Sequence, residues 1–415
     1  GTEVAAPVAN RTRPLAGLRV LEASGFLAGP FAAMTLADLG ADVIKVEPPD
    51  GDPARTIGER MTEDLSPTFV GGNRGKRSVA LDLRSPEGRA LVRRLATRSD
   101  VVIHNQQVGV AERLGLARAA LADENPGVIV GRIAAFGPDG PYADRPALDP
   151  VVQAMSGMMS LTGPPGGEPV RTAAPVVDIG AGLSAATAVL AALHARGRTG
   201  VGADITISLF ETGLMFNSPF FPLRSWLGEE LRRRGNMSHA ILSDQFAAAD
   251  GFLTLAVWDE ARWTRLCELL GLDALRDRPE CADNRSRVRH YEHLRPALAD
   301  AIAGRRVAEL RAALQEAGIP CGITYGLGAV AADEHVRATG ALYAERRLVD
   351  RELLMVAGPI RIDGERPPST APAPRLGEHT RAVLTELLTE PVQHLDELEA
   401  AGVIIDRGAT VGGPA

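Results

Sequence analysis

The sequence predicts an α/β protein with a large domain built on a Rossmann-like parallel sheet and a smaller α+β domain. Strand-like and helix-like segments alternate from residue 17 to about 210, as they do along a parallel sheet. Between about 220 and 330 the pattern changes, and Asp250-Gly251 marks a hairpin there. A chain of 415 residues is also longer than a single hydrophobic core usually accommodates, so two domains are expected. We therefore expect a large domain over 1–220, a small domain over 221–330, and a linker with terminal helices, 331–415, that returns to the large domain.

The clearest structural unit lies near the start of the chain. Residues 15–21 contain a short buried strand, Gly29-Pro30 opens a helix, and residues 42–46 form a second buried strand. A strand, a helix and a strand at this spacing predict a right-handed crossover of a parallel sheet. The loop over residues 24–30 then opens at the carboxyl edge of the sheet, where ligands bind in such folds.

The remaining elements follow in order along the chain. Ser85-Pro86-Glu87 begins a helix with a hydroxyl cap, a first-turn proline and an early acid. Expected strands of the large domain are 77–83, 101–103, 128–133 and 203–209, and expected helices are 85–97, 150–159 and 182–195. The small domain should contain the hairpin 241–257 and helices 260–270 and 291–317, and helices 377–388 and 392–401 should end the chain.

Composition excludes several classes of function. The net charge of −7 argues against a nucleic-acid-binding surface. Three cysteines far apart and eight scattered histidines predict neither a disulfide framework nor a metal site. The amino terminus lacks an apolar signal core, and no uninterrupted apolar run has membrane length, so we expect a cytoplasmic protein with no membrane partner.

Two glycine-rich segments resemble nucleotide-binding motifs but fail on detail. In residues 71–77 only three residues separate the glycines of the phosphate-loop pattern, and Arg77 follows Lys76 where Ser or Thr is needed. Residues 180–185 fit a loose dinucleotide fingerprint, yet Asp204 falls at the beginning of the following strand instead of its end. Neither segment therefore predicts a nucleotide site.

Asp178 is the strongest candidate for chemistry. It follows an apolar run and stands just before Gly180 and Gly182, which read as a helix start. A helix amino terminus stabilises a carboxylate or an oxyanion, and glycines let another backbone or a ligand approach closely. On the pattern alone, a capping role for Asp178 is favoured, because Asp caps helices so often.

Four segments together resemble the class III coenzyme A transferase family, which includes formyl-CoA transferase, carnitine CoA-transferase and 2-methylacyl-CoA racemases. They are residues 15–47, 73–88, 149–157 and 374–380, in the order of the family. The resemblance implies an acyl-CoA:carboxylate CoA-transferase in which Asp178 attacks the thioester and becomes a covalent aspartyl-CoA thioester. Backbone N–H groups near Gly180 and Gly182 would stabilise the oxyanions. The implied substrates are an acyl-CoA and a carboxylic acid, with no tightly bound cofactor, no metal and no nucleic acid.

The same resemblance implies a CoA-binding site and a homodimer with interlocked chains. Carried over by position, the CoA-binding residues are Phe26, Leu27, Ala28, Leu81, Arg84, Asn105, Gln106 and Arg113. Leu81 and Arg84 would flank the adenine and the 3′-phosphate. The chain departs from the family at Pro48, where some members have an Arg, and at His104-Asn105-Gln106, where many read Glu-Asn-Phe.

One position separates the transferase from the racemase branch. Racemases carry a His directly before the Asp of the third signature, whereas Leu148 precedes Asp149 here. Leucine cannot exchange a proton, so half of a two-base apparatus is absent, unless Asp244 takes that place. The transferase is therefore the favoured reading; a racemase and a non-catalytic acyl-CoA-binding protein remain the alternatives.

Overall fold

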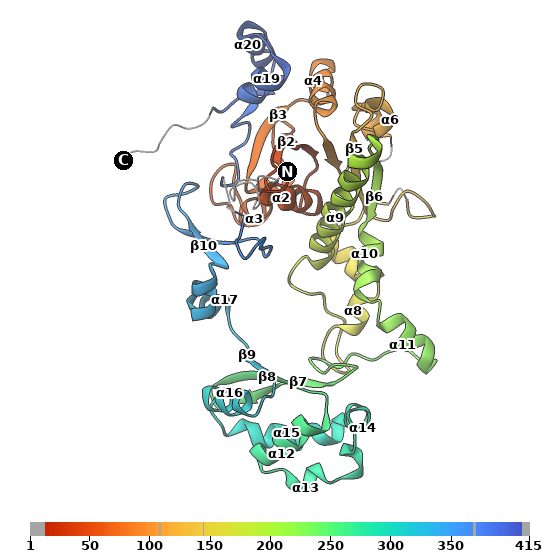
Figure 1. Ribbon diagram of the computed structural model, residues 1–415, viewed down its shortest axis with the longest axis vertical. Coiled ribbons are helices and arrows are strands. Elements are labelled where there is room, and N and C mark those ends of the chain that lie inside the picture. Colours follow the sequence, from red (N-terminus) through yellow and green to blue (C-terminus); the bar gives the residue numbers. More distant parts are fainter. Residues whose placement is uncertain (1–12, 108, 144, 368–370, 409–415) are drawn as a thin grey trace, which may run out of the picture. The chain divides into compact units, whose positions relative to one another are not determined.

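The computed structural model describes residues 13–107, 109–143, 145–367 and 371–408 (Figure 1). The chain divides into two compact units. The large unit comprises 1–158, 172–219 and 339–415, and the small unit comprises 159–171 and 220–338. The sequence assigned 159–171 to the large domain. This segment belongs with the small unit because Arg233 donates hydrogen bonds to the carbonyls of Ser160 and Gly167.

A seven-stranded sheet forms the centre of the large unit, in the order β12-β3-β2-β1-β4-β5-β6. Its strands are β1 (Arg19–Ala23), β2 (Asp42–Glu47), β3 (Lys76–Leu81), β4 (Val101–His104), β5 (Ile129–Ala134), β6 (Asp204–Ser208) and β12 (Ile404–Ile405). All neighbours are parallel except β12, which pairs antiparallel with β3. The order from β3 to β6 is that of a doubly wound fold, so the predicted α/β class is confirmed. The strand order reverses between β1 and β4, which makes the gap between their carboxyl ends the expected ligand crevice.

Helices and a short hairpin complete the large unit. Its helical elements are α2 (Ala28–Asp38), η1 (Pro53–Arg55), α3 (Pro67–Asn73), α4 (Pro86–Thr97), α5 (Val110–Arg113), α6 (Arg118–Leu121), α7 (Asp149–Met155), α9 (Val176–Thr199), α10 (Leu209–Phe216), α19 (Thr380–Leu388) and α20 (Val392–Ala400). α8 (Met158–Leu161) follows α7. β10 (Leu342–Glu345) and β11 (Leu353–Val356) pair antiparallel.

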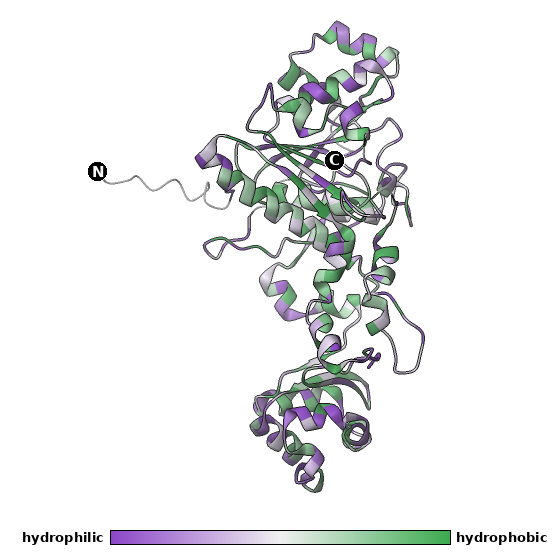
Figure 2. Ribbon diagram, turned by 90° about the vertical axis from the view of Figure 1, so that its right-hand side faces the viewer, coloured by the Kyte–Doolittle hydropathy of each residue, from purple (hydrophilic) through white to green (hydrophobic). Residues whose placement is uncertain are grey.

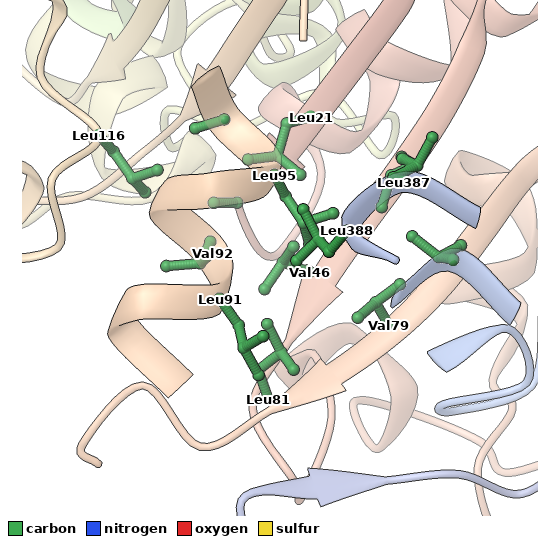
Figure 3. Packing of buried hydrophobic residues seen from close by; sticks show 14 of the residues in the cluster. Leu21, Val46, Val79, Leu81, Leu91, Val92, Leu95, Leu116, Leu387 and Leu388 are labelled. Carbon is green, nitrogen blue, oxygen red and sulfur yellow. The ribbon is translucent and has the colours of Figure 1, made fainter. Parts of the chain in front are cut away.

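Three apolar cores form in the described part of the large unit. One includes side chains of β1, β2 and β3 together with α4 and α19, and Figure 3 shows part of it. Labelled there are Leu21, Val46, Val79, Leu81, Leu91, Val92, Leu95, Leu116, Leu387 and Leu388. A second core includes α2 and α9. A third, smaller core joins η1 and α3 to β11. The first two cores cover opposite faces of the sheet: Leu21 of β1 belongs to the first and Val20 to the second, as in a parallel sheet covered by helices on both faces.

Helix α9 is the longest helix of the described residues, with 24 residues. An 18-residue stretch of this helix has a mean hydropathy of 1.9, so by length and composition alone the helix could cross a membrane, although Asp178 interrupts the apolar run. Core helices of soluble proteins meet the same criterion, and α9 buries Val177, Ala181 and Ala185 in the core that it shares with α2.

The small unit is a separate α+β layer structure. β7 (Leu242–Ala248), β8 (Gly251–Val257) and β9 (Cys321–Ile323) form an antiparallel sheet. The predicted hairpin is present, but its turn residues are 249–250 and not Asp250-Gly251, because Gly251 already pairs with Ala248. Its helical elements are α11 (Phe220–Leu227), α12 (Glu260–Leu270), α13 (Asp273–Arg276), η2 (Pro279–Cys281), α14 (Asn284–Arg289), α15 (Tyr291–Ala303), α16 (Val307–Glu316), α17 (Leu327–Ala332) and α18 (Glu334–Thr339). Figure 2 shows the helices of this unit with apolar and polar residues interleaved, as an amphipathic layer over a small core requires.

Candidate active site

The loops after β1 and β4 are joined at the point where the strand order reverses. The Gly25 N–H donates to Asn105 Oδ1 at 3.2 Å, and Asn105 Nδ2 donates back to the Gly25 carbonyl at 3.0 Å. Gln106 Nε2 donates to the Ala23 carbonyl at 3.1 Å. The sequence predicted Asn105 and Gln106 as ligand-binding residues, and the structure places both beside the loop that precedes α2.

A cavity of about 660 Å³ opens at this edge of the sheet. Leu83, Arg84, Arg89, Gln106, Val110, Arg113 and Leu114 line it. Three of the predicted residues, Arg84, Gln106 and Arg113, thus meet in one cavity although they are distant in sequence. Arg89 was missed; its signal is its place in α4, one turn after the predicted helix start. Three guanidinium groups beside leucine and valine side chains suit a ligand that combines phosphates with an apolar ring.

The structure corrects the prediction for Leu81. Its side chain is fully buried in β3, opposite Ile404 of β12, and belongs to the core shown in Figure 3. Leu83 lines the cavity instead, because β3 ends at Leu81 and the chain then turns out of the sheet.

The three predicted residues at the start of α2 differ in exposure. Phe26 is 38% exposed, Leu27 is the N-cap residue of α2, and Ala28 is 7% exposed within the first turn. Phe26 has φ of 66°, a left-handed conformation that residues other than glycine rarely adopt. The part of this segment that can meet a ligand is therefore Phe26 with the backbone that follows it.

Asp178 lies in the first turn of α9, not before it. Pro175 is the N-cap residue of α9, and it has no side-chain acceptor that could cap the helix. The capping interpretation of Asp178 is therefore wrong. Its carboxylate accepts no hydrogen bond from any residue within the described part of the chain, and the side chain is partly buried.

Asp149 of α7 caps α9 in place of Asp178. Asp149 Oδ2 accepts from the N–H groups of Val177 and Asp178, at 2.8 and 3.2 Å. Asp149 Oδ1 accepts from Gln153 Nε2 at 2.6 Å, and Gln153 Oε1 accepts from the Thr172 N–H at 3.0 Å. This chain of contacts fixes Asp149, which is 3% exposed, against the helix end that carries Asp178.

Burial raises the pKa of Asp178 from 3.8 to about 7, and the negative charge of Asp149 adds to the shift. Both causes disfavour the ionised carboxylate. Asp178 is therefore a poorly solvated carboxylate that ionises near neutrality. Perturbed carboxyl groups of this kind occur at functional sites more often than elsewhere.

Gly180 and Gly182 have a packing role. A Cβ on Gly180 would lie 2.7 Å from the Phe216 ring, and one on Gly182 would lie 2.8 Å from the Ala28 carbonyl oxygen. Their own N–H groups lie inside α9, where each donates to the carbonyl four residues back. This corrects the prediction that these amides are free to bind an oxyanion. The contact of Gly182 with Ala28 also places the first turn of α2 against α9, about 6 Å, or one helical turn, beyond Asp178.

The structure also describes the two residues on which the racemase alternative depends, Leu148 and Asp244. Leu148 is the N-cap residue of α7 and is 51% exposed, so no proton-exchanging side chain precedes Asp149. Asp244, in the small unit, accepts from the Tyr291 hydroxyl at 2.6 Å and pairs with Arg295 at 2.9 Å. The Gln245 N–H donates to Asp244 Oδ1 at 2.7 Å as well, and a carboxylate held by three donors is a structural ion pair and not a free base.

Comparison with known proteins agrees with this geometry. The family model of CoA-transferase family III matches residues 15–380. The chain is 38% identical to the succinate–glutarate CoA-transferase of Agrobacterium fabrum, over 92% of this chain and 97% of that protein. It is 33% identical to the succinyl-CoA–D-citramalate CoA-transferase of Chloroflexus aurantiacus, over 94% and 98%. The crystal structure of a CAIB/BAIF family protein from Brucella suis superposes with a TM-score of 0.81 at 35% identity, over 91% and 100% of the chains. The chain is a CoA-transferase and belongs to CoA-transferase family III.

Proposed function

We propose that the protein transfers coenzyme A from an acyl-CoA to a carboxylic acid through a covalent aspartyl-CoA thioester on Asp178. The observation that carries this proposal is the Asp178 carboxylate itself, which is partly buried, beside the charge of Asp149, and accepts no hydrogen bond from the residues described. A carboxylate with little solvation is a stronger nucleophile than one that is held by donors or by water.

The transfer proceeds in four steps. The Asp178 carboxylate attacks the donor thioester carbon, the C–S bond breaks, and a mixed anhydride and the CoA thiolate result. The thiolate attacks the aspartyl carbonyl and releases the donor acid, which leaves the aspartyl-CoA thioester. The acceptor carboxylate then attacks that thioester and again releases the thiolate. The thiolate attacks the acceptor carbonyl, which gives the new acyl-CoA and restores Asp178.

The cavity at the sheet edge is the proposed binding site for the nucleotide part of CoA. Arg84, Arg89 and Arg113 bring guanidinium groups to the cavity for the phosphates, and Arg84 exchanges its exposed ion pair with Asp82 for a phosphate. Leu83, Val110 and Leu114 supply the apolar surface for adenine. The relatives named above act on succinate, glutarate, succinyl-CoA or D-citramalate, so short dicarboxylic acids and their CoA thioesters form the first substrate panel.

We further propose a homodimer, as the family resemblance implies. Supporting it, α7 and the residue before it leave Leu148, Val151 and Met155 between 41% and 51% exposed, and α9 leaves Leu183 45% exposed. Apolar surface of this extent is typical of protein interfaces. Light scattering of the purified chain at micromolar concentration tests this, and a stable species of 43.8 kDa contradicts it. The cytoplasmic location stays a prediction.

The nucleophile is tested by Asp178→Ala, with Asp204→Asn, at an exposed position of β6, as control. We expect Asp178→Ala to reduce transfer about a thousandfold or more while CoA still binds, and the control to keep wild-type turnover. Hydroxylamine should convert Asp178 to a hydroxamate, detected by mass spectrometry, only when acyl-CoA is present. Turnover of Asp178→Ala within about tenfold of wild type excludes Asp178 as the nucleophile. CoA binding without any hydroxamate supports the non-catalytic alternative.

A further inference from the structure

The loop between β1 and α2 has a backbone conformation that its sequence does not favour. Phe26 has φ of 66°, and in the described residues only Asp363 and Thr389 share this property among residues other than glycine. Gly25 precedes Phe26, and a glycine at 26 would adopt the same backbone without strain. A strained residue persists only where its surroundings hold it in place, and such residues cluster at binding and catalytic sites.

Three buried side chains hold this loop along its length: Lys45 of β2, Lys76 of β3 and Asp52, which follows β2 as the N-cap residue of η1. Asp52 Oδ1 accepts from the N–H of Phe26 at 3.0 Å. Lys45 Nζ donates to the Ser24 carbonyl at 2.9 Å, and Lys76 Nζ donates to the Pro30 carbonyl at 2.8 Å. The loop therefore has charged contacts at its first residue, at the strained residue and at the first turn of the helix that follows.

The groups that make these contacts form one network without access to water. Glu22 joins the two lysines, at 2.8 Å from Lys45 and 2.7 Å from Lys76, and Lys45 also lies 2.8 Å from Asp52. All four side chains are at most 1% exposed. Burial opposes the charge on Glu22, yet the two lysines hold the pKa of its carboxyl at about 2. Charged hydrogen bonds are strong in such a dry environment, so the network is rigid.

From this arrangement we infer that Asp52, Lys45 and Lys76 are positioning residues for acyl-CoA, which hold the 24–30 loop, and Phe26 in particular, in the conformation that the ligand meets. The inference rests on the proposed function, in which this loop lines the CoA site. The strained backbone brings the Phe26 side chain, 38% exposed, to the carboxyl edge of the sheet. Through Ala28 the same loop contacts Gly182, one turn beyond Asp178. The network thereby couples the sheet edge to the nucleophile helix.

A double-mutant cycle in the full-length protein tests the inference. The variants are Asp52→Asn, Phe26→Gly and the pair, and the readout is CoA affinity by calorimetry together with kcat and KM. We expect Asp52→Asn alone to weaken CoA binding and to raise KM about tenfold, with a smaller change in kcat. In the Phe26→Gly background the same substitution should change CoA affinity less than about threefold, because glycine needs no support at this φ. Asp123→Asn, at an exposed position outside the network, is the matched control.

Additive effects of the two substitutions overturn the inference, since a merely structural Asp52 would harm both backgrounds equally. CoA affinity does not depend on covalent catalysis. If no hydroxamate forms but the two substitutions still act non-additively on CoA affinity, the nucleophile proposal fails and the positioning inference stands. If Asp52→Asn does not fold, Phe26→Gly is compared with Phe26→Ala, because both lose the ring and only alanine keeps the strain. We expect the glycine variant to melt at the higher temperature and to bind CoA at least as well, and the reverse order refutes the inference.

Discussion

Replacing Asp178 by Asn should make the protein more stable at neutral and alkaline pH. The rise of the Asp178 pKa from 3.8 to about 7 corresponds to about 4 kcal/mol against the ionised form. Partial solvent contact of the side chain reduces this to about 2 kcal/mol. The folded state binds the proton more tightly than the unfolded state, so wild-type stability falls as pH rises from 3.8 to about 7 and is constant above. Asparagine resembles the protonated acid and avoids this loss.

The assay is thermal and urea unfolding of wild type and Asp178→Asn from about pH 4.5 to about pH 8.5. We expect near-equal stability at the acid end and an advantage of about 2 kcal/mol for Asn above neutrality. Asp204→Asn, at an exposed position, controls for the loss of one negative charge and should show no such trend. A difference that does not change with pH, or an Asn variant that is less stable throughout, refutes the argument that Asp178 is held in an unfavourable environment.

Three further outcomes follow from the same geometry. The kcat/KM of transfer should rise with pH through a limb near 7. Asp149→Asn removes the like charge beside Asp178 and should move that limb to lower pH, whereas an unmoved limb shows that burial alone sets the pKa of Asp178. Gly182→Ala should destabilise the protein by about 1–3 kcal/mol in urea unfolding, because its Cβ would lie 2.8 Å from a backbone oxygen, whereas Gly197→Ala, with open space in the same helix, should be neutral or stabilising. Arg113→Ala should raise KM for acyl-CoA about tenfold with little change in kcat, and less for dephospho-CoA thioesters if the guanidinium binds the 3′-phosphate.

The sequence was sufficient for features that depend on neighbours in the chain. The crossover from β1 through α2 to β2 and the hairpin of β7 and β8 both carry local signals. These signals are an apolar run, a Gly-Pro helix start and the Asp250-Gly251 pair, which lies one residue after the start of the observed turn. The expected helix 291–317 is two helices, because Gly304 ends α15 and Arg306 begins the next element. Periodicity alone did not mark that break.

The candidate site depended on contacts between distant residues, and these the sequence could not supply. Gly180 and Gly182 read as a helix start, yet α9 begins at Val176 because its cap is Asp149, 28 positions before the first amide that it binds. Likewise Leu81 was assigned to the ligand by its position in the family resemblance, and the strand was expected to run to residue 83. The strand ends at Leu81, whose side chain is buried opposite Ile404 of β12, a partner far away in the sequence. Two contacts between residues distant in sequence, Asp149 with the start of α9 and Ile404 with Leu81, account for these corrections.

The pairing of β12 with β3 has a consequence for the synthesis of the protein. Leu81 of β3 lies opposite Ile404, which the ribosome adds 323 residues later. At the usual rate of translation, the edge of β3 stays unpaired for roughly 15–60 s, while residues 220–338 can already fold as a nearly continuous unit. Arg55 donates to the Pro374 carbonyl at 3.2 Å, and this partner is synthesised 319 residues after Arg55. An unpaired strand edge can pair with another chain, so until Ile404 has emerged β3 offers nascent copies of this protein a site for association.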